Sequence, residues 1–253
     1  MRIAVVSGAS SGMGREFVKI IDQKCSHLDE IWVMARRKER LQKLQFHVHH
    51  PLRIFDLDLS QETSIYQMQA VMDQKKPKIC VLVASAGYGK HGKAETISLE
   101  DAMQMVQVNV EALTGLTQMS LPYMVRGGRI LLLASSAAFV PEPGFGIYAA
   151  TKSYVYSYAR SLNQELKKRK IYVTAVCPGP VRTEFLKVSG ADQNVSPMKK
   201  IVTADPKAVV QKAWKDSMER RAVSIYGTPM KCAAVLTKFL PQGIVIKGMD
   251  LFL

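Results

Sequence analysis

A tyrosine and a lysine one helical turn apart are the residues whose types and spacing point most directly to chemistry. Tyr148 and Lys152 stand at i and i+4 in Tyr-Ala-Ala-Thr-Lys, which puts both side chains on one face of a helix. A free tyrosine has a pKa of about 10, and a neighbouring ammonium group lowers it. General acid–base catalysis works best when the pKa lies near the operating pH. We therefore predict that Tyr148 donates a proton to a carbonyl oxygen, with Lys152 as its electrostatic partner.

Two serines upstream of the tyrosine suit the same reaction. Ser135 and Ser136 follow the apolar run 130–133, which predicts a buried strand, and Tyr148 lies some 13 residues further along. A hydroxyl at the end of that strand can hydrogen-bond the carbonyl oxygen that the tyrosine protonates. Either serine therefore qualifies as the group that polarises the carbonyl.

A glycine-rich turn near the N-terminus predicts a phosphate site. Residues 7–14 read Ser-Gly-Ala-Ser-Ser-Gly-Met-Gly, between a predicted strand at 3–6 and a predicted helix at 13–24. Glycines permit a tight turn and close backbone approach, and the N-terminus of the helix offers free N–H groups to a pyrophosphate. The residues expected to bind the dinucleotide here are Gly8, Ser10, Ser11, Gly12, Met13 and Gly14.

Two arginines after the second predicted strand, at 31–35, indicate which nicotinamide binds. A fold that prefers NAD carries an acidic residue about 20 residues past the glycines, where it holds the ribose 2′-hydroxyl. Here Arg36 and Arg37 fill this place and no carboxylate does. A guanidinium group offers a planar fork of donors suited to phosphate. We therefore predict NADP(H), with Ser10 as a further ligand of the 2′-phosphate.

Later strands end in residues that suit the adenosine half of such a cofactor. The sequence Asp-Leu-Asp-Leu at 56–59 places Asp58 and Leu59 where the adenine would lie, with Asp56 as the alternative carboxylate. Ala86 and Gly87 permit the backbone to approach a ribose. Either aspartate also fits the entry of a helix.

Short apolar runs alternate with longer amphipathic ones along the chain. The predicted strands lie at 3–6, 31–35, 53–55, 79–83, 130–133 and 171–176, with a seventh candidate at 223–226. Continuous apolar strands separated by helices predict parallel pairing with helices on both faces. The expected fold is a doubly wound α/β sheet of six or seven strands (Rossmann-like), in a single domain over residues 1–253. Such sheets bind ligands beyond the carboxyl ends of their strands.

On these residues the chain resembles the short-chain dehydrogenase/reductase family over about residues 2–183. Members of this family carry the glycine turn, a serine after the fifth strand, the Tyr-x-x-x-Lys helix start and a Pro-Gly segment after the sixth strand. The last of these stands here as Cys-Pro-Gly-Pro-Val-Arg-Thr at 177–183.

The resemblance implies roles for several further residues. The usual family spacing of 13 residues selects Ser135, with Ser136 as the fallback. Asn109, in Val-Asn-Val, matches an asparagine that seats a water relaying protons to the lysine. The residues implied to contact the nicotinamide, with Thr183 at its carboxamide, are Pro178, Gly179, Val181 and Thr183. Tyr148 and Lys152 are implied to contact the cofactor as well, with Lys152 on the ribose of the nicotinamide.

The activity implied by the resemblance is the reversible reduction of a carbonyl, of the ketone or 3-oxoacyl type, to a secondary alcohol by hydride from NADPH, without a metal. A lid is expected over residues 184–204, and its apolar residues favour a partly apolar small-molecule substrate. A homodimer or homotetramer is also expected. A non-catalytic NADP(H)-binding sensor or scaffold is the alternative, but such a module has no need of the complete Asn–Ser–Tyr–Lys set.

Two segments depart from the family pattern. Residues 84–87 read Ala-Ser-Ala-Gly where the family often has Asn-Asn-Ala-Gly, so side-chain bonds that brace the central strands are lost. The tail at 227–253 is atypical, because Gly-Thr-Pro stands where many members have Asp-Gly-Gly, and the apolar segment 233–239 follows. We expect this tail either to mediate dimerisation or to contact a membrane.

Composition bounds the remaining classes. The 253 residues are 47% hydrophobic and 22% charged, which excludes disorder as the main state, and the net charge is +14. The four cysteines stand far apart, which predicts neither a zinc site nor a dithiol pair and favours a reducing compartment, the cytoplasm. The longest apolar run, 130–140, is too short to span a membrane. The basic clusters recur near predicted helix ends without a nucleic-acid motif, so no nucleic-acid partner is expected.

Overall fold

A parallel sheet of seven strands forms the centre of the computed structural model, which describes residues 1–190 and 203–250. The strands are β1 (Arg2–Ser7), β2 (Glu30–Met34), β3 (Leu52–Phe55), β4 (Lys78–Ala84), β5 (Met124–Leu133), β6 (Tyr172–Cys177) and β7 (Val223–Ile225). Their order in the sheet is β3-β2-β1-β4-β5-β6-β7, and every neighbouring pair is parallel. The predicted fold class is therefore confirmed, including the seventh strand.

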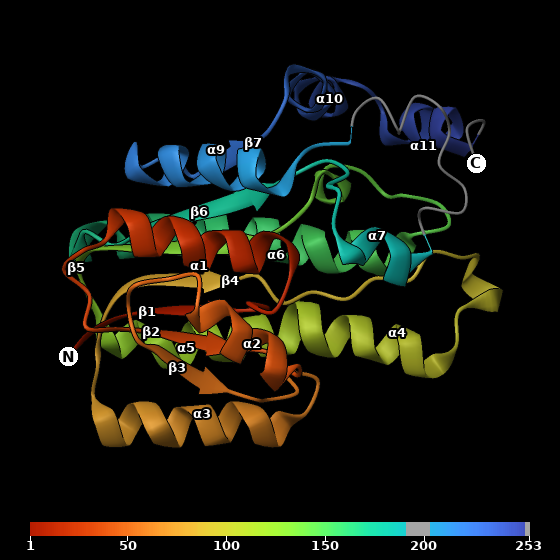
Figure 1. Ribbon diagram of the computed structural model, residues 1–253. Helices are drawn as coiled ribbons and strands as arrows, with labels where there is room; N and C mark the ends of the chain where they lie inside the picture. Colours follow the sequence, from red (N-terminus) through yellow and green to blue (C-terminus); the bar gives the residue numbers. More distant parts are fainter. Residues whose placement is uncertain (191–202, 251–253) are drawn as a thin grey trace.

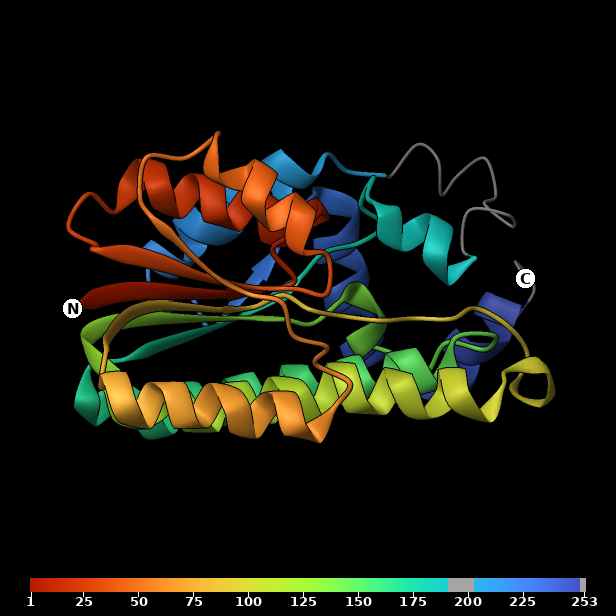
Figure 2. The ribbon, with the colours of Figure 1, turned by 60° about the horizontal axis from the view of Figure 1, so that its bottom comes forward.

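Helices cover both faces of this sheet, as Figures 1 and 2 show. One layer holds α1 (Gly12–Lys24), α2 (Lys38–Gln45) and α9 (Pro206–Met218). The opposite layer holds α3 (Glu62–Lys75), α4 (Leu99–Val106), α5 (Leu113–Ser120) and α6 (Gly146–Glu165). Three further helices, α7 (Glu184–Ser189), α10 (Thr228–Phe239) and α11 (Gln242–Asp250), lie toward the carboxyl ends of the strands. The short helices are η1 (Ala94–Thr96), η2 (Gln107–Ala112), η3 (Leu121–Tyr123), η4 (Ser136–Ala138) and η5 (Leu166–Arg169).

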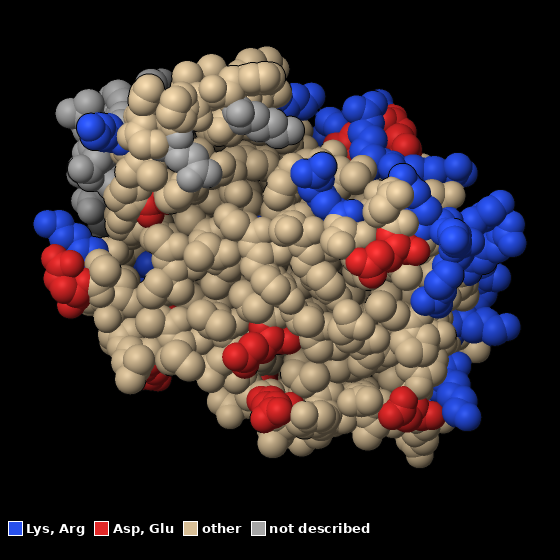
Figure 3. All heavy atoms as spheres, turned by 180° about the vertical axis from the view of Figure 1, so that it is seen from behind, with Lys and Arg blue, Asp and Glu red and all other residues tan. Residues whose placement is uncertain are grey.

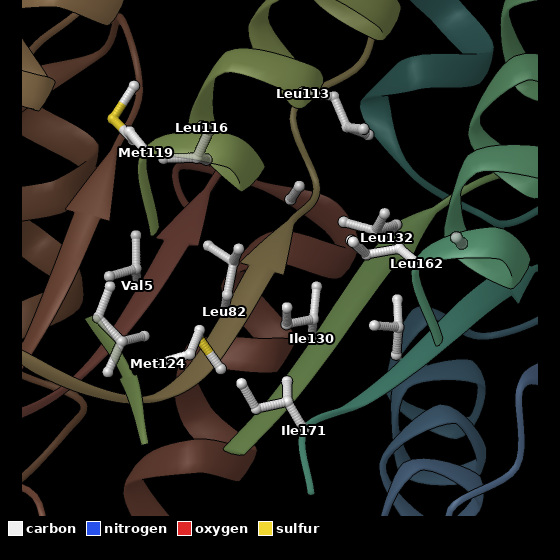
Figure 4. Packing of buried hydrophobic residues seen from close by; sticks show 14 of the residues in the cluster. Val5, Leu82, Leu113, Leu116, Met119, Met124, Ile130, Leu132, Leu162 and Ile171 are labelled. Atoms are coloured by element: carbon white, nitrogen blue, oxygen red, sulfur yellow. The ribbon is translucent and has the colours of Figure 1, made fainter. Parts of the chain in front are cut away.

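The core divides into two halves because successive strand residues point to opposite faces. Val5 packs on one face with Leu116 from α5 and Leu162 from α6 (Figure 4). Its neighbour Val6 packs on the other face with Phe17 from α1. All five side chains are buried. Burial on both faces explains why these strands read as continuous apolar runs.

The long helical stretch from Leu99 to Ser120 changes its hydrogen-bonding pattern in the middle. It consists of α4, the π-helical segment η2 and α5, in direct succession. A π-helical turn inserts an extra residue into the backbone ladder and is often found at functional sites. Asn109 lies in this segment and is fully buried. This change therefore sets where the predicted relay residue points.

The predicted lid and tail are only partly described. α7 opens the lid segment, but residues 191–202 and 251–253 lie outside the described residues, as do the predictions that fall on them. The tail forms α10 and α11. The single-domain assignment and the lid function remain predictions. Among the described residues, no helix combines the length and apolar character needed to cross a membrane.

Candidate active site

The glycine turn is held so tightly that side chains at two of its positions would clash with backbone. A Cβ on Gly8, whose φ is +67°, would stand 2.8 Å from the backbone nitrogen of Ala86. A Cβ on Gly14 would stand 2.2 Å from the carbonyl oxygen of Gly8. α1 begins directly after Ser11 with neither a side-chain cap nor an acidic residue in its first turn. Its positive end therefore remains available to an anion, as a pyrophosphate site requires.

Arg37 joins this turn to α7. Its Nη2 donates to the hydroxyls of Ser10 (3.2 Å) and Ser11 (2.9 Å), while its Nη1 pairs with Glu184 of α7 at 2.7 Å. Arg40 pairs with the other oxygen of Glu184 at 2.5 Å. These hydrogen bonds, first from Arg40 and then from Arg37, lower the pKa of Glu184 to about 2. Arg36 is exposed and lines the same cleft, so both predicted arginines are present.

The two aspartates considered for the adenine site have different surroundings. Asp58 lines the cleft and accepts hydrogen bonds from the backbone nitrogen (3.0 Å) and hydroxyl (2.8 Å) of Ser60, at the entry to α3. Asp56 instead pairs with Lys38 at 3.3 Å. Of the two, Asp58 is the one positioned at the cleft, and its contact with adenine stays a prediction.

The predicted catalytic tyrosine lies in an aromatic sandwich. Tyr148, near the start of α6, stacks on Phe145 with ring centroids 4.2 Å apart and planes 20° from parallel. Phe185 of α7 contacts it at 5.4 Å in a tilted arrangement. A Cβ on Gly89 would meet all three rings, the nearest atom at 2.7 Å, so only glycine fits there. The phenol is therefore fixed in orientation by packing, and it hydrogen-bonds Ser135.

Ser135 follows the end of β5, and Lys152 reaches that strand end from α6, one turn after Tyr148. Ser135 caps η4 by accepting from the backbone nitrogen of Ala137 at 3.2 Å. The Nζ of Lys152 donates to the carbonyl oxygen of Leu133 at 2.8 Å and lies 5.5 Å from the centre of the Tyr148 ring. The structure thus brings the predicted serine, tyrosine and lysine together at one strand end. Ser136 lines the same cleft as the fallback.

The prediction that Lys152 lowers the pKa of Tyr148 is wrong for this structure. Burial raises the pKa of the Tyr148 phenol well above its ordinary value, and the hydrogen bond from Ser135 opposes this only in part. Burial also lowers the pKa of Lys152, to about 8. The physical reason is that the aromatic sandwich removes water from the phenol, while the ammonium group is turned toward the Leu133 carbonyl. A raised pKa keeps the phenol protonated at neutral pH, which suits a proton donor.

Asn109 links the loop after β4 to α6 by hydrogen bonds. Its amide exchanges two hydrogen bonds with the backbone of Tyr88, at 2.9 and 2.7 Å, and donates a third to Thr151 of α6 at 3.0 Å. A Cβ on Gly87 would stand 3.4 Å from Asn109 Oδ1 and 3.5 Å from the Nζ of Lys152. Asn109 and Lys152 therefore border the same small space, and the relay of protons through a water there stays a prediction.

One cleft of about 1010 Å³ connects these groups. It is lined by every predicted site residue except Asn109, from Gly8 in the turn to Thr183 after β6. Sequence reasoning missed several lining residues, namely Tyr88, His91, Lys93, Gln104, Glu142, Phe145 and Glu184. Most of these come from loops after β4 and β5, where no local pattern marks a side chain as facing a cleft. Phe145 is the exception, because it stands three residues before Tyr148 at the start of the same helix.

Comparisons with known proteins identify the family of this chain. A model of the family described as short chain dehydrogenase matches residues 2–194. The NADP-dependent 3-hydroxy acid dehydrogenase YdfG of Escherichia coli is 32% identical over 190 residues, covering 74% of this chain and 75% of that protein. A short-chain dehydrogenase from Sphingobium yanoikuyae in complex with NADPH superposes with a TM-score of 0.80 at 25% identity, covering 96% and 97% of the two chains. The closed form of a serine dehydrogenase complexed with NADP⁺ gives 0.76 at 29% identity, covering 88% and 93%.

The parallel sheet, the glycine turn and the serine, tyrosine and lysine at its carboxyl edge define a dinucleotide-dependent oxidoreductase. The chain belongs to the short chain dehydrogenase family and, as such, interconverts a CH–OH group and a carbonyl with a nicotinamide cofactor.

Proposed function

We propose that this protein is an NADP(H)-dependent carbonyl reductase, reversible as an alcohol dehydrogenase. The observation that carries the proposal is the placement of Tyr148, Ser135 and Lys152 in the same cleft as the glycine turn and the arginine pair. A pure binding module would need the turn and the arginines, but not a buried phenol aimed at a serine hydroxyl.

The residues of the cleft fit the cofactor. The Cβ positions of Gly8 and Gly14 are filled by backbone, and the unneutralised start of α1 suits a pyrophosphate. Arg36 and Arg37 would hold the 2′-phosphate, with the Ser10 hydroxyl beside them. NADP dependence in the name of the E. coli relative, and NADPH or NADP⁺ in the two neighbours, support the same choice.

Each catalytic side chain has a separate task. When bound, the nicotinamide would supply the hydride. Ser135 donates a hydrogen bond to the carbonyl oxygen of the substrate and so orients and polarises it. Tyr148 donates the proton to that oxygen, and its raised pKa ensures that it carries this proton at neutral pH. Lys152, whose Nζ is held by the Leu133 carbonyl, would bind the ribose of the nicotinamide, and Asn109 fixes the backbone of Tyr88 at the edge of the site.

The substrate end of the cleft favours a partly apolar molecule. Phe145, Phe185 and Tyr88 supply rings there, and Val188 adds an exposed aliphatic group. We propose a ketone or 3-oxoacyl compound as the substrate class, which the hydroxy acid in the name of the E. coli relative supports in part.

The proposal is tested by replacing Tyr148 with phenylalanine. Tyr148→Phe keeps the aromatic stack on Phe145 but removes the proton donor, so turnover of a ketone panel with NADPH should fall by about 10²–10⁴. Fluorescence titration should show NADPH affinity nearly unchanged. Tyr154→Phe is the matched control, because Tyr154 lies on the same helix and its hydroxyl contacts only Thr114 among the described hydrogen bonds. Full turnover by Tyr148→Phe, or no turnover of any carbonyl by the wild type, would contradict the proposal.

A further inference from the structure

The helix α10 turns an apolar stripe toward solvent. Cys232, Val235, Leu236 and Phe239 follow the i, i+3, i+4, i+7 spacing that places them on one face of the helix. All four are exposed, Val235 and Leu236 by 56% each and Phe239 by 80%. Ile244 of α11 is 61% exposed as well. A contiguous apolar surface of this kind marks an interaction site more often than a stray exposed side chain does.

The other side of α10 already has a packing partner. Ala234 is buried, and Met230 packs so closely on the Pro-Gly segment that a Cβ on Gly179 would lie 2.8 Å from its sulfur. α10 is therefore seated on the wall of the catalytic cleft by its inner side. The exposed side chains of the stripe lie outside this contact. Packing within the protein therefore does not explain why they are apolar.

The basic residues of the same segment indicate which kind of surface binds the stripe. From Arg220 to the end of α11 the sequence contains a single acidic residue, Asp250. The same stretch contains the basic residues Arg220, Arg221, Lys231, Lys238 and Lys247. In Figure 3 the top of the molecule, where α10 lies, is a mostly tan ridge with basic side chains beside it. An exposed apolar stripe in a strongly basic segment is the pattern of helices that lie in the interface of an anionic bilayer.

A second copy of this chain fits the surface less well. In a twofold dimer the same patch meets itself, so the basic residues of this segment would approach basic residues of the other copy. The segment 220–250 offers a single carboxylate, Asp250, against five basic residues. A bilayer that contains anionic lipids supplies both the apolar phase and the negative charge.

We propose that α10 and α11 dock the protein on the surface of an anionic lipid bilayer, with Val235, Leu236, Phe239 and Ile244 inserted among the acyl chains. Docking of this kind requires no spanning helix, and the described residues contain none. Because Met230 of α10 packs on Gly179, the docked surface adjoins the wall of the cleft. The proposal does not depend on the activity proposed above.

Vesicle flotation with the full-length protein tests the docking. The wild type should float with vesicles of phosphatidylcholine mixed with phosphatidylglycerol, and less with phosphatidylcholine alone or at high salt. Phe239→Glu should weaken the binding by at least about tenfold, because it removes a large inserted side chain and adds negative charge. Phe46→Glu is the matched control: Phe46 is 86% exposed, but it lies at the end of α2, and its replacement should leave the binding unchanged.

Thermal unfolding of Phe239→Glu separates loss of docking from loss of fold, and because Phe239 is mostly exposed its melting temperature should equal that of the wild type. The proposal fails if the wild type floats with neither vesicle, or if Phe239→Glu and Phe46→Glu bind equally well. Light scattering that shows a dimer dependent on Phe239, without vesicle binding, would instead assign this surface to a second copy.

Discussion

The buried ammonium group of Lys152 should make the protein less stable than it would be with an apolar side chain in its place. Burial lowers the pKa of Lys152 from its ordinary 10.5 to about 8. Each unit by which folding lowers the pKa corresponds to about 1.4 kcal/mol. Keeping Lys152 charged in the folded protein at pH 7 therefore lowers the free energy of unfolding by about 3 kcal/mol. Lys152→Met removes that cost but leaves the Leu133 carbonyl without its donor, a loss of about 1 kcal/mol.

The net expectation for Lys152→Met is a gain of about 2 kcal/mol at pH 7, together with loss of turnover. For a chain of this size the gain corresponds to a rise in melting temperature of about 4–8 °C. The exposed Lys168 gives the matched control, and Lys168→Met should leave the melting temperature nearly unchanged. Calorimetry on the three proteins measures both differences.

The pH dependence provides a second and sharper check. Because the pKa of Lys152 is lower in the folded state, the unfolded state binds more protons between pH 8 and 10.5. The wild type should therefore gain stability relative to Lys152→Met as the pH rises through this window, and the difference between the two should shrink. A variant less stable than the wild type at pH 7, or a difference that stays constant from pH 8 to 10.5, would refute the assignment of a destabilising charge.

Three further changes follow from contacts at the cofactor end. Gly14→Ala places a Cβ against the Gly8 carbonyl, so it should lower the free energy of unfolding by about 2–3 kcal/mol and abolish NADPH binding. The control Gly146→Ala has open space around it and should change the free energy of unfolding by less than about 1 kcal/mol in denaturant titrations. Equal effects of the two substitutions would contradict this prediction. Arg37→Ala should weaken NADPH binding by about tenfold or more and leave NADH binding unchanged in calorimetric titration, and parallel losses would remove Arg37 from the 2′-phosphate site. Glu184→Gln should increase amide hydrogen exchange in α7. The free energy of unfolding should fall by less than about 1 kcal/mol, because the Arg37–Glu184 ion pair is half exposed. Unchanged exchange would show that the ion pair does not hold the helix.

The parts of the site that depend on local patterns could be predicted from the sequence. The glycine turn, the Tyr-x-x-x-Lys face and the strand ends each depend on residues close together in the chain, and the structure places them in one cleft. α9 also has local signals, since Asp205 caps it and Pro206 occupies its first turn, although the sequence analysis did not assign a helix there. Near the end of the chain, the spacing of Val235, Leu236 and Phe239 is visible in the sequence, but not which side of the helix faces solvent.

The remaining features arise from contacts between distant segments. The π-helical segment at Asn109 is set by bonds to Tyr88 and Thr151, which come from two other elements. The pKa of Tyr148 depends on its degree of burial, and this is decided largely by rings before and after it in the chain. The Arg37–Glu184 pair joins residues 147 positions apart. No periodicity or motif records these distances, so sequence reasoning named candidate reacting groups that lie in one cleft but misjudged the pKa of Tyr148.

The short helix α7 connects the two ends of the cleft through adjacent residues. Glu184 pairs with Arg37 and Arg40 at the end assigned to the 2′-phosphate, and Phe185 packs on Tyr148 at the end assigned to proton transfer. The backbone of His91 also donates to the Ser189 carbonyl at 2.8 Å, which fixes the far end of the helix. All these contacts come from one helix of six residues, so a shift of α7 as a unit would disturb them together. Displacement of α7 by a ligand at the arginines would therefore uncover the ring of Tyr148 as well.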